Sequence, residues 1–199
     1  MKPNLFLVAI AAILVSFSPA GYKIGDEVKD FSLKNVNGKM VSMNDYKDAK
    51  GFIVVFTCNH CPFAKAYESR ILLLDKKYAP KGFPVLAINP NDPNVVEEDS
   101  YSNMVALASE KKYTFPYLFD ETQEIAHAYG ATRTPHVFIV KKENGKNILK
   151  YIGAIDNNSE DAKSATQHYV EDAVDALLSG KPVTTTETKA IGCTIKWKS

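Results

Sequence analysis

The chain is short of the features that mark several common classes of protein. Its 199 residues include 3 cysteines and 1 tryptophan, and its formal net charge is +1 at pH 7. A charge so close to zero argues against a nucleic-acid-binding protein, because nucleic acid calls for a concentrated basic face. The sequence also lacks low-complexity tracts and internal repeats. It is still long enough for one globular domain with a full hydrophobic core.

The sequence has no apolar run of the length that a membrane span needs. Its one long apolar run, residues 5–15, follows Lys2 and precedes the small residues Ser18 and Ala20. This pattern predicts a cleaved export signal over residues 1–20, with a retained N-terminal anchor as the alternative. We therefore expect an exported protein, periplasmic or extracellular, without stable membrane insertion after cleavage.

Three cysteines are too few for a framework of structural disulfides. In an oxidising compartment disulfides persist, but an odd number of cysteines leaves one thiol over and allows a single bridge within the monomer. Cys58 and Cys61 form a Cys-x-x-Cys motif and pair naturally, which leaves Cys193 alone.

Hydrophobic periodicity predicts an α/β domain over residues 21–180. A hairpin is expected around Asn37-Gly38, joining residues 31–33 and 40–42, and a buried central strand is expected at residues 52–57. Further strands are predicted at residues 84–89, 117–119, 136–140 and 147–152, and helices at 63–78, 100–112, 123–129 and 161–178. The early alternation of strands and helices favours parallel central strands, and the late hairpin adds antiparallel edge strands. We expect a mixed sheet with helices on both faces.

The Cys-x-x-Cys motif lies between the central strand and the first long helix. A thiol over a helix N-terminus is favoured as a thiolate, because the partial positive charge there stabilises the anion. Such a pair is suited to forming and breaking one disulfide.

Three features coincide in this chain: the Cys58–Cys61 junction, the order of strands and helices, and Thr134-Pro135 immediately before a strand. In these respects the chain resembles the thioredoxin-like superfamily, in its AhpC/TSA and TlpA-like branch, over about residues 25–178. The resemblance implies a thioredoxin-like fold, with a central mixed β-sheet flanked by helices on both faces and an N-terminal β-hairpin. Residues 181–199 would form a C-terminal extension.

The resemblance also implies roles for individual residues. Cys58 would be the attacking thiol, Cys61 the resolving thiol, and Pro135 a cis-proline packed against their disulfide. The backbone of Thr134 would then pair with an extended substrate strand. The expected activity is thiol–disulfide exchange with protein or peptide substrates and a redox partner protein. No cofactor is expected beyond the Cys58–Cys61 disulfide, and no metal.

Other residues would support the pair. Thr57 stands where many relatives have Trp, Pro62 fits the start of a redox helix, and Arg133 lies at a distance that could bring it near the thiols. His60 is expected to stabilise the Cys58 thiolate, which would lower its pKa and raise the reduction potential above that of thioredoxin. The alternative is that His60 points into solvent.

Two other functions on the same fold were weighed. A peroxiredoxin needs a Thr three residues before its peroxidatic Cys, and Val55 stands there, so peroxidase activity is not expected even though Arg133 matches. A copper chaperone would draw on Cys58, His60 and Cys61, with His136 or Cys193 as further soft ligands, but the cysteine spacing is one residue shorter than in the copper-delivery proteins. A binding module without catalysis is disfavoured because both cysteines are present.

Cys193 has two interpretations. Ile191, Cys193 and Ile195 occupy alternate positions, as residues on one face of a strand do. Free cysteines are more often small buried residues than reactive thiols, so the first interpretation is that Cys193 is simply buried. The second interpretation is that the tail folds back to the site, where Cys193 is a third thiol that traps or resolves a mixed disulfide. We favour the first interpretation on the sequence alone.

Overall fold

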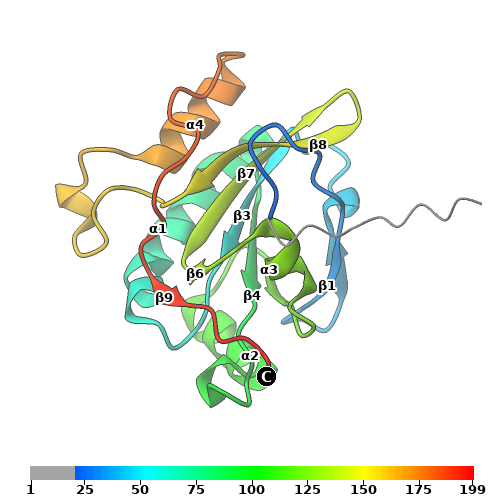
Figure 1. The fold of residues 1–199 in the computed structure, drawn as a ribbon, viewed down its shortest axis with the longest axis vertical. Helices are drawn as coiled ribbons and strands as arrows, with labels where there is room; N and C mark the ends of the chain where they lie inside the picture. The colour runs from blue at the N-terminus through cyan, green and yellow to red at the C-terminus, as the bar shows by residue number, and fades with distance from the viewer. Residues whose placement is uncertain (1–20) are drawn as a thin grey trace, which may run out of the picture.

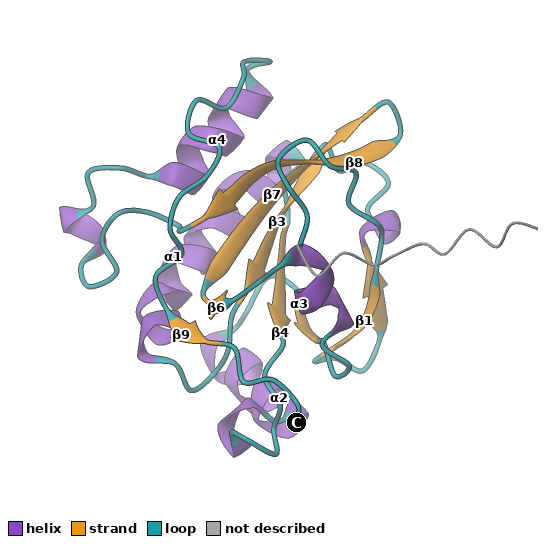
Figure 2. Ribbon diagram, viewed as in Figure 1, coloured by secondary structure: helices purple, strands orange, loops and turns teal. Residues whose placement is uncertain are grey.

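A mixed seven-stranded sheet runs through the middle of the domain, in the strand order β2-β1-β5-β4-β3-β7-β8 (Figures 1 and 2). The computed structural model describes residues 21–199, so the predicted export signal lies outside the described residues. The strands are β1 (Ser32–Asn35), β2 (Met40–Ser42), β3 (Gly51–Phe56), β4 (Val85–Asn89), β5 (Tyr117–Phe119), β7 (His136–Glu143) and β8 (Lys146–Gly153).

The topology confirms the order expected from the sequence. β3, β4 and β5 are parallel neighbours, whereas β7 runs antiparallel to β3 and forms a hairpin with β8. β1 and β2 form the predicted N-terminal hairpin.

Strand β3 divides the hydrophobic core into two layers. All six of its residues are buried, as its continuous apolar sequence predicts for a strand covered on both faces. Because side chains alternate along a strand, Ile53 and Val55 enter one cluster while Phe52, Val54 and Phe56 enter the other.

Helices cover both faces of the sheet. The layer of Ile53 and Val55 is closed by buried side chains from α1 (Pro62–Tyr78), α2 (Tyr101–Lys111) and α4 (Tyr169–Leu178). The opposite layer is closed by α3 (Glu124–Tyr129) and the N-terminal segment (Figure 1). No helix among residues 21–199 has both the length and the apolar character to cross a membrane.

The last helix begins later than the sequence pattern predicts, at Tyr169 instead of near residue 161. The preceding segment holds only a single 3-10 turn, Ala162–Ser164, and is organised by side chains. Asp161 accepts a hydrogen bond from the Lys163 amide, and Asn157 Oδ1 accepts from the amides of Thr166 and Gln167. Such side-chain acceptors compete with helical hydrogen bonds, which is why the helix starts beyond them.

The tail after α4 returns across the domain and adds a second, two-stranded sheet. It consists of β6 (Arg133–Thr134) and β9 (Cys193–Thr194), which pair antiparallel. Figure 1 shows the tail in red passing α1 and then, as β9, lying beside β6. The strand predicted in the tail is therefore present, but it is only two residues long.

A buried ion pair ties the loop after β8 to α1. The guanidinium of Arg70 binds Asp156 at 2.9 and 2.7 Å, and the Tyr67 hydroxyl donates to the same carboxylate at 2.8 Å. Arg70 and Asp156 are 8% and 3% exposed. Loss of one partner would leave the other charge buried without compensation.

We expect Asp156→Ala to lower the free energy of unfolding by about 3–5 kcal/mol, because it leaves Arg70 buried and unpaired. Urea denaturation followed by circular dichroism measures the change. The matched control is Glu171→Ala, which removes the partner of Lys77 where both side chains are about 40% exposed, 41% and 39%. It should cost less than about 1 kcal/mol. Equal losses in the two variants would contradict this prediction.

Candidate active site

The Cys-x-x-Cys motif lies at the junction of β3 and α1, as predicted. Cys61 is the N-cap residue of α1 and Pro62 occupies the first turn, where its missing N–H is no loss. Cys58 is 5% exposed and Cys61 is completely buried. The two cysteines form one buried cluster with Ala64, and Cys193 packs against it.

Thr134 forms the facing wall of the site. The Thr134–Pro135 bond is cis, which confirms the prediction for Pro135. The Thr134 hydroxyl lies 3.1 Å from Cys58 Sγ, and the Thr134 carbonyl oxygen lies 3.2 Å from Cys61 Sγ. One residue thus contacts both sulfurs of the motif.

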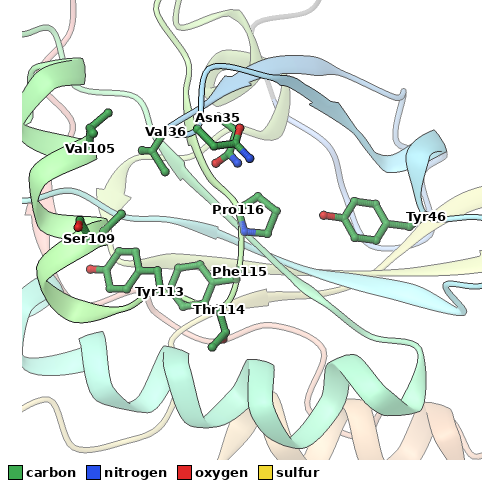
Figure 3. Close-up of a pocket in the computed structure, with 11 residues that line it drawn as sticks. Asn35, Val36, Tyr46, Val105, Ser109, Tyr113, Thr114, Phe115 and Pro116 are labelled. Atoms are coloured by element: carbon green, nitrogen blue, oxygen red, sulfur yellow. The ribbon is translucent and has the colours of Figure 1, made fainter.

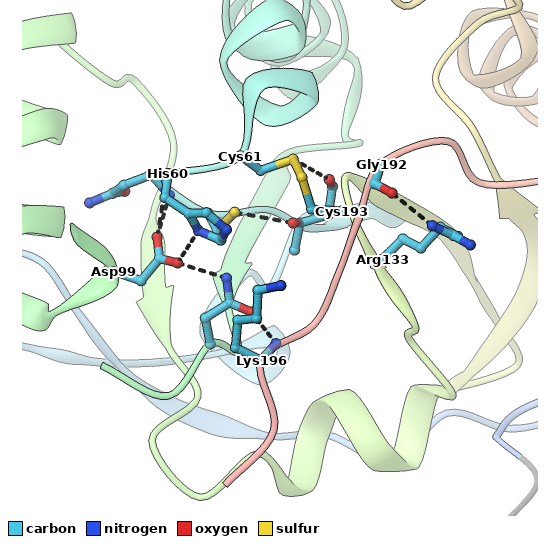
Figure 4. The surroundings of a disulfide bond; sticks show 11 residues. His60, Cys61, Asp99, Arg133, Gly192, Cys193 and Lys196 are labelled. Atoms are coloured by element: carbon cyan, nitrogen blue, oxygen red, sulfur yellow. Dashed lines mark hydrogen bonds and ion pairs between the residues drawn. A yellow bond between two sulfur atoms is a disulfide. The ribbon is translucent and has the colours of Figure 1, made fainter. Parts of the chain in front are cut away.

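The disulfide in the structure joins Cys61 to Cys193, with the two Cα atoms 6.0 Å apart (Figure 4). Cys58 is a free, buried thiol. The bridge expected from the sequence, Cys58–Cys61, is therefore not the one present. The physical reason is the docking of the tail, because β9 places Cys193 opposite Thr134, which itself lies on Cys61.

The tail is held closely at this point. A Cβ added to Gly192 would lie 2.2 Å from the Thr134 carbonyl oxygen, so only glycine permits this approach. Arg133, expected near the thiols, instead donates from Nη1 to the Gly192 carbonyl at 2.8 Å (Figure 4). Thr57 is also buried, and its amide continues the sheet by donating to Ile88 at 2.8 Å.

A buried carboxylate, Asp99, organises the motif from the other side. Its Oδ1 accepts from the amides of Asn59 at 2.7 Å and His60 at 3.3 Å. Its Oδ2 lies 2.5 Å from His60 Nδ1 and accepts from Asn91 Nδ2 at 2.7 Å (Figure 4). Asp99 is not among the site residues predicted from the sequence. The sequence feature that could have pointed to it is the polar run after β4, because residues that follow the carboxyl end of a strand line the sites of open α/β sheets.

The structure reverses the expectation for the Cys58 pKa. Burial and, to a smaller extent, the nearby Asp99 carboxylate together raise the pKa of the Cys58 thiol to about 11. Hydrogen bonds from Thr134 and from the amides of Cys61 and His60 offset only part of this effect. The imidazole of His60 faces Asp99, so the solvent-facing alternative is wrong. The reduction potential stays a prediction, to be measured in a glutathione buffer.

Three potential metal ligands meet beside the motif. The ligand atoms of Cys58, His60 and Asp99 all lie within 4.8 Å of one another. His136 is not part of this group. It begins β7, accepts from the Thr132 amide at 3.4 Å, and packs against Phe138. Burial, with a smaller effect from Arg133, lowers the pKa of His136 to about 4.

A separate surface pocket lies between the β1–β5 side of the sheet and α2 (Figure 3). Its volume is about 520 Å³, and it is lined by residues that include Asn35, Val105, Tyr113 and Pro116. No cysteine lines it. The chemistry of the thiols therefore does not extend to this pocket.

A cysteine pair at a helix start, facing a cis-proline that precedes the neighbouring strand of a mixed sheet, defines a protein of thioredoxin-like fold. The exposed lipoprotein thioredoxin Etrx1 of Streptococcus pneumoniae strain TIGR4 shares this fold with a TM-score of 0.56 at 20% identity, over 76% of this chain and 99% of that chain. The profile of the AhpC/TSA family matches residues 24–150. The chain belongs to the AhpC/TSA family.

Two further proteins are more informative about this chain. An uncharacterized conserved protein from Geobacillus kaustophilus is 39% identical, with a TM-score of 0.81 over 88% of this chain and 93% of that one. The thiol-disulfide oxidoreductase ResA of Bacillus thuringiensis (strain Al Hakam) is 24% identical over 169 residues, which cover 77% of this chain and 91% of ResA. The chain is thus related to redox enzymes that act through thiols.

With the Cys61–Cys193 bridge intact, the rate at which iodoacetamide alkylates Cys58 should rise with pH along a titration curve whose midpoint is near 11, because only the thiolate reacts. Asp99→Asn removes the negative charge that opposes ionisation, so the midpoint should fall and the rate at pH 7 should rise several-fold. Mass spectrometry of the Cys58 peptide gives the rate. The control is Glu98→Gln, which removes an exposed neighbouring charge and should leave the midpoint unchanged. A wild-type midpoint near 9 would contradict this prediction.

Proposed function

We propose that this protein exchanges disulfides with protein or peptide substrates, with Cys58 as the attacking thiol and Cys61 as the resolving thiol. The observation that carries the proposal is a free thiol, Cys58, in one cluster with a cysteine that already holds a disulfide. The relationship to ResA supports the same class of reaction.

The proposed reaction has two steps. The Cys58 thiolate attacks one sulfur of a substrate disulfide, which breaks and releases the other sulfur as a thiolate that takes up a proton. Cys61, in its thiol form, then loses its proton and attacks Cys58 Sγ, so that the Cys58–Cys61 disulfide forms and the second substrate thiol leaves. Two electrons pass from the protein to the substrate, and the reverse sequence oxidises a dithiol substrate.

The contacts of Thr134 explain how a substrate would be held. Thr134 contacts Cys58 through its hydroxyl and pairs with an extended segment, β9, through its backbone. An edge that accepts an extended strand beside the attacking sulfur suits peptide substrates, which bind by strand addition. This supports protein or peptide disulfides as the substrate class, together with a redox partner protein.

We also propose that the protein acts outside the cytoplasm, after export directed by residues 1–20. The basic start, short apolar run and small residues of that segment support the proposal. An oxidising compartment is compatible with a chain that carries a disulfide.

The proposal does not include peroxidase activity. Val55, three residues before Cys58, is a completely buried apolar side chain in the core between β3 and α1. It has no hydroxyl to hydrogen-bond a peroxide.

Cys58→Ser should abolish the reduction of insulin disulfides by the protein in the presence of dithiothreitol, because Cys61 is completely buried and cannot replace Cys58 as the attacking thiol. Cys61→Ser should instead accumulate a mixed disulfide between Cys58 and substrate, because resolution is lost. Turbidity measures the first effect and non-reducing electrophoresis the second. Wild-type turnover in Cys58→Ser would refute the proposed roles.

A second candidate function is copper binding, and the cluster of Cys58, His60 and Asp99 favours it. A thiolate and an imidazole are soft enough to select Cu(I). The reduced protein should then retain about one Cu(I) per chain after dialysis, and Cys58→Ser and His60→Ala should lose it. His168→Ala, at an exposed position before α4, is the matched control. Retention by Cys58→Ser would exclude this site.

A further inference from the structure

The tail brings a third sulfur to the site through many contacts of its own. Ile195 is 3% exposed and its amide donates to Thr132 at 3.2 Å. Gln123 donates to the Lys196 carbonyl at 2.8 Å and accepts from the Lys198 amide at 2.8 Å. Trp197 stacks on His127 with ring centroids 4.1 Å apart. These contacts lie on both the backbone and the side chains, and they bring Cys193 to Cys61.

We propose that Cys193 is a third redox-active residue, which accepts Cys61 from the Cys58–Cys61 disulfide and so regenerates the free Cys58 thiol. This inference rests on the proposed thiol–disulfide exchange, because that reaction generates the Cys58–Cys61 disulfide. The bridge in the structure, Cys61–Cys193 beside a free Cys58, is the product of the added step.

The step is a balanced thiol–disulfide exchange. The Cys193 thiol loses its proton to water, and the thiolate attacks Cys61 Sγ. The Cys58–Cys61 bond breaks, the Cys61–Cys193 bond forms, and the electron pair leaves on Cys58 Sγ, which takes up a proton. The number of disulfides in the protein is unchanged, so no further oxidant or reductant is consumed.

Burial restricts which thiols can reach Cys61. Its side chain has no exposed surface, and the sulfurs that share its cluster are those of Cys58 and Cys193. Cys193 is only half-buried, so an external thiol can approach the bridge on that side. A dithiol reductant would therefore meet the bridge at Cys193.

The same step closes the substrate edge. In the bridged form β9 occupies the backbone of Thr134, at the position where a substrate strand would pair. Substrate and bridged tail therefore exclude each other, and the protein must be reduced before it accepts another substrate strand.

The test begins with the full chain equilibrated in a glutathione redox buffer, quenched with acid and mapped by mass spectrometry. The wild type should carry Cys61–Cys193 in roughly tenfold excess over Cys58–Cys61. Gly192→Ala should reverse this preference, because the added Cβ would collide with the Thr134 backbone and keep the tail away. This variant leaves all three cysteines in place.

Ile191→Ala is the matched control, because Ile191 precedes Gly192 and is 40% exposed. It should keep the wild-type distribution. A wild type that carries mainly Cys58–Cys61 would overturn the proposal, and so would a Gly192→Ala distribution equal to that of Ile191→Ala.

A second arm separates this inference from the proposed function. Reduced protein is mixed with one equivalent of a disulfide-bonded peptide and quenched over time. In the wild type Cys58–Cys61 should appear first and convert to Cys61–Cys193, whereas Cys193→Ser should stop at Cys58–Cys61. If the peptide is reduced but the wild type also stops at Cys58–Cys61, the role of Cys193 is refuted and thiol–disulfide exchange stands. If wild type and Cys193→Ser both leave the peptide intact, thiol–disulfide exchange is refuted and with it the relay, whatever bridge the glutathione buffer produces.

Discussion

The site depends on one residue, Thr134, which meets all three cysteines. Its hydroxyl contacts Cys58, its carbonyl contacts Cys61, and its backbone pairs with Cys193. The adjoining strand β7 lies against β3, the strand that leads into the motif, so the sheet fixes both walls of the site relative to each other. A buried, hydrogen-bonded sheet is a rigid support, and it lets three sulfurs from distant parts of the chain share one small volume.

The ionisation of the Cys58 thiol depends on its burial more than on the N-terminus of α1. The N-terminus of α1 favours an anion, but Cys58 is enclosed and lies near the carboxylate of Asp99. Asp99 is itself held by two amides and two side chains, so its negative charge is stabilised in place. A protein can thus keep its nucleophile protonated when the site is closed, which protects the sulfur from unwanted oxidation.

Much of the fold could be predicted from the sequence, because its signals are local. The apolar run of β3, the Asn37-Gly38 turn and the Cys-x-x-Cys junction each act within a few residues, and the structure has them where they were expected. The cis bond at Pro135 could also be predicted, because the resemblance to a known fold supplied it. The start of α4 could not, since it depends on hydrogen bonds that Asn157 accepts from amides nine and ten residues away.

The cysteine pairing escaped prediction for a different reason. Cys61 and Cys193 are separated by 132 residues, and nothing in the local sequence states where a tail will dock. Asp99 likewise reaches His60 of the motif across 39 residues of sequence. The sheet and its loops bring Cys193 and Asp99 to the motif, so their contribution to the site can be recognised only from the three-dimensional structure.

The long span of the Cys61–Cys193 bridge also bears on what proteolysis would do to this molecule. The bridge encloses the turn at Asn144-Gly145, an exposed loop tip of the kind that proteases cut first. A single cut there would leave two polypeptides joined through one pair of sulfur atoms, which migrate as one band in denaturing electrophoresis until a reductant is added. In denaturant, the redox state of the tail would then decide whether the two fragments of a nicked molecule stay joined or separate.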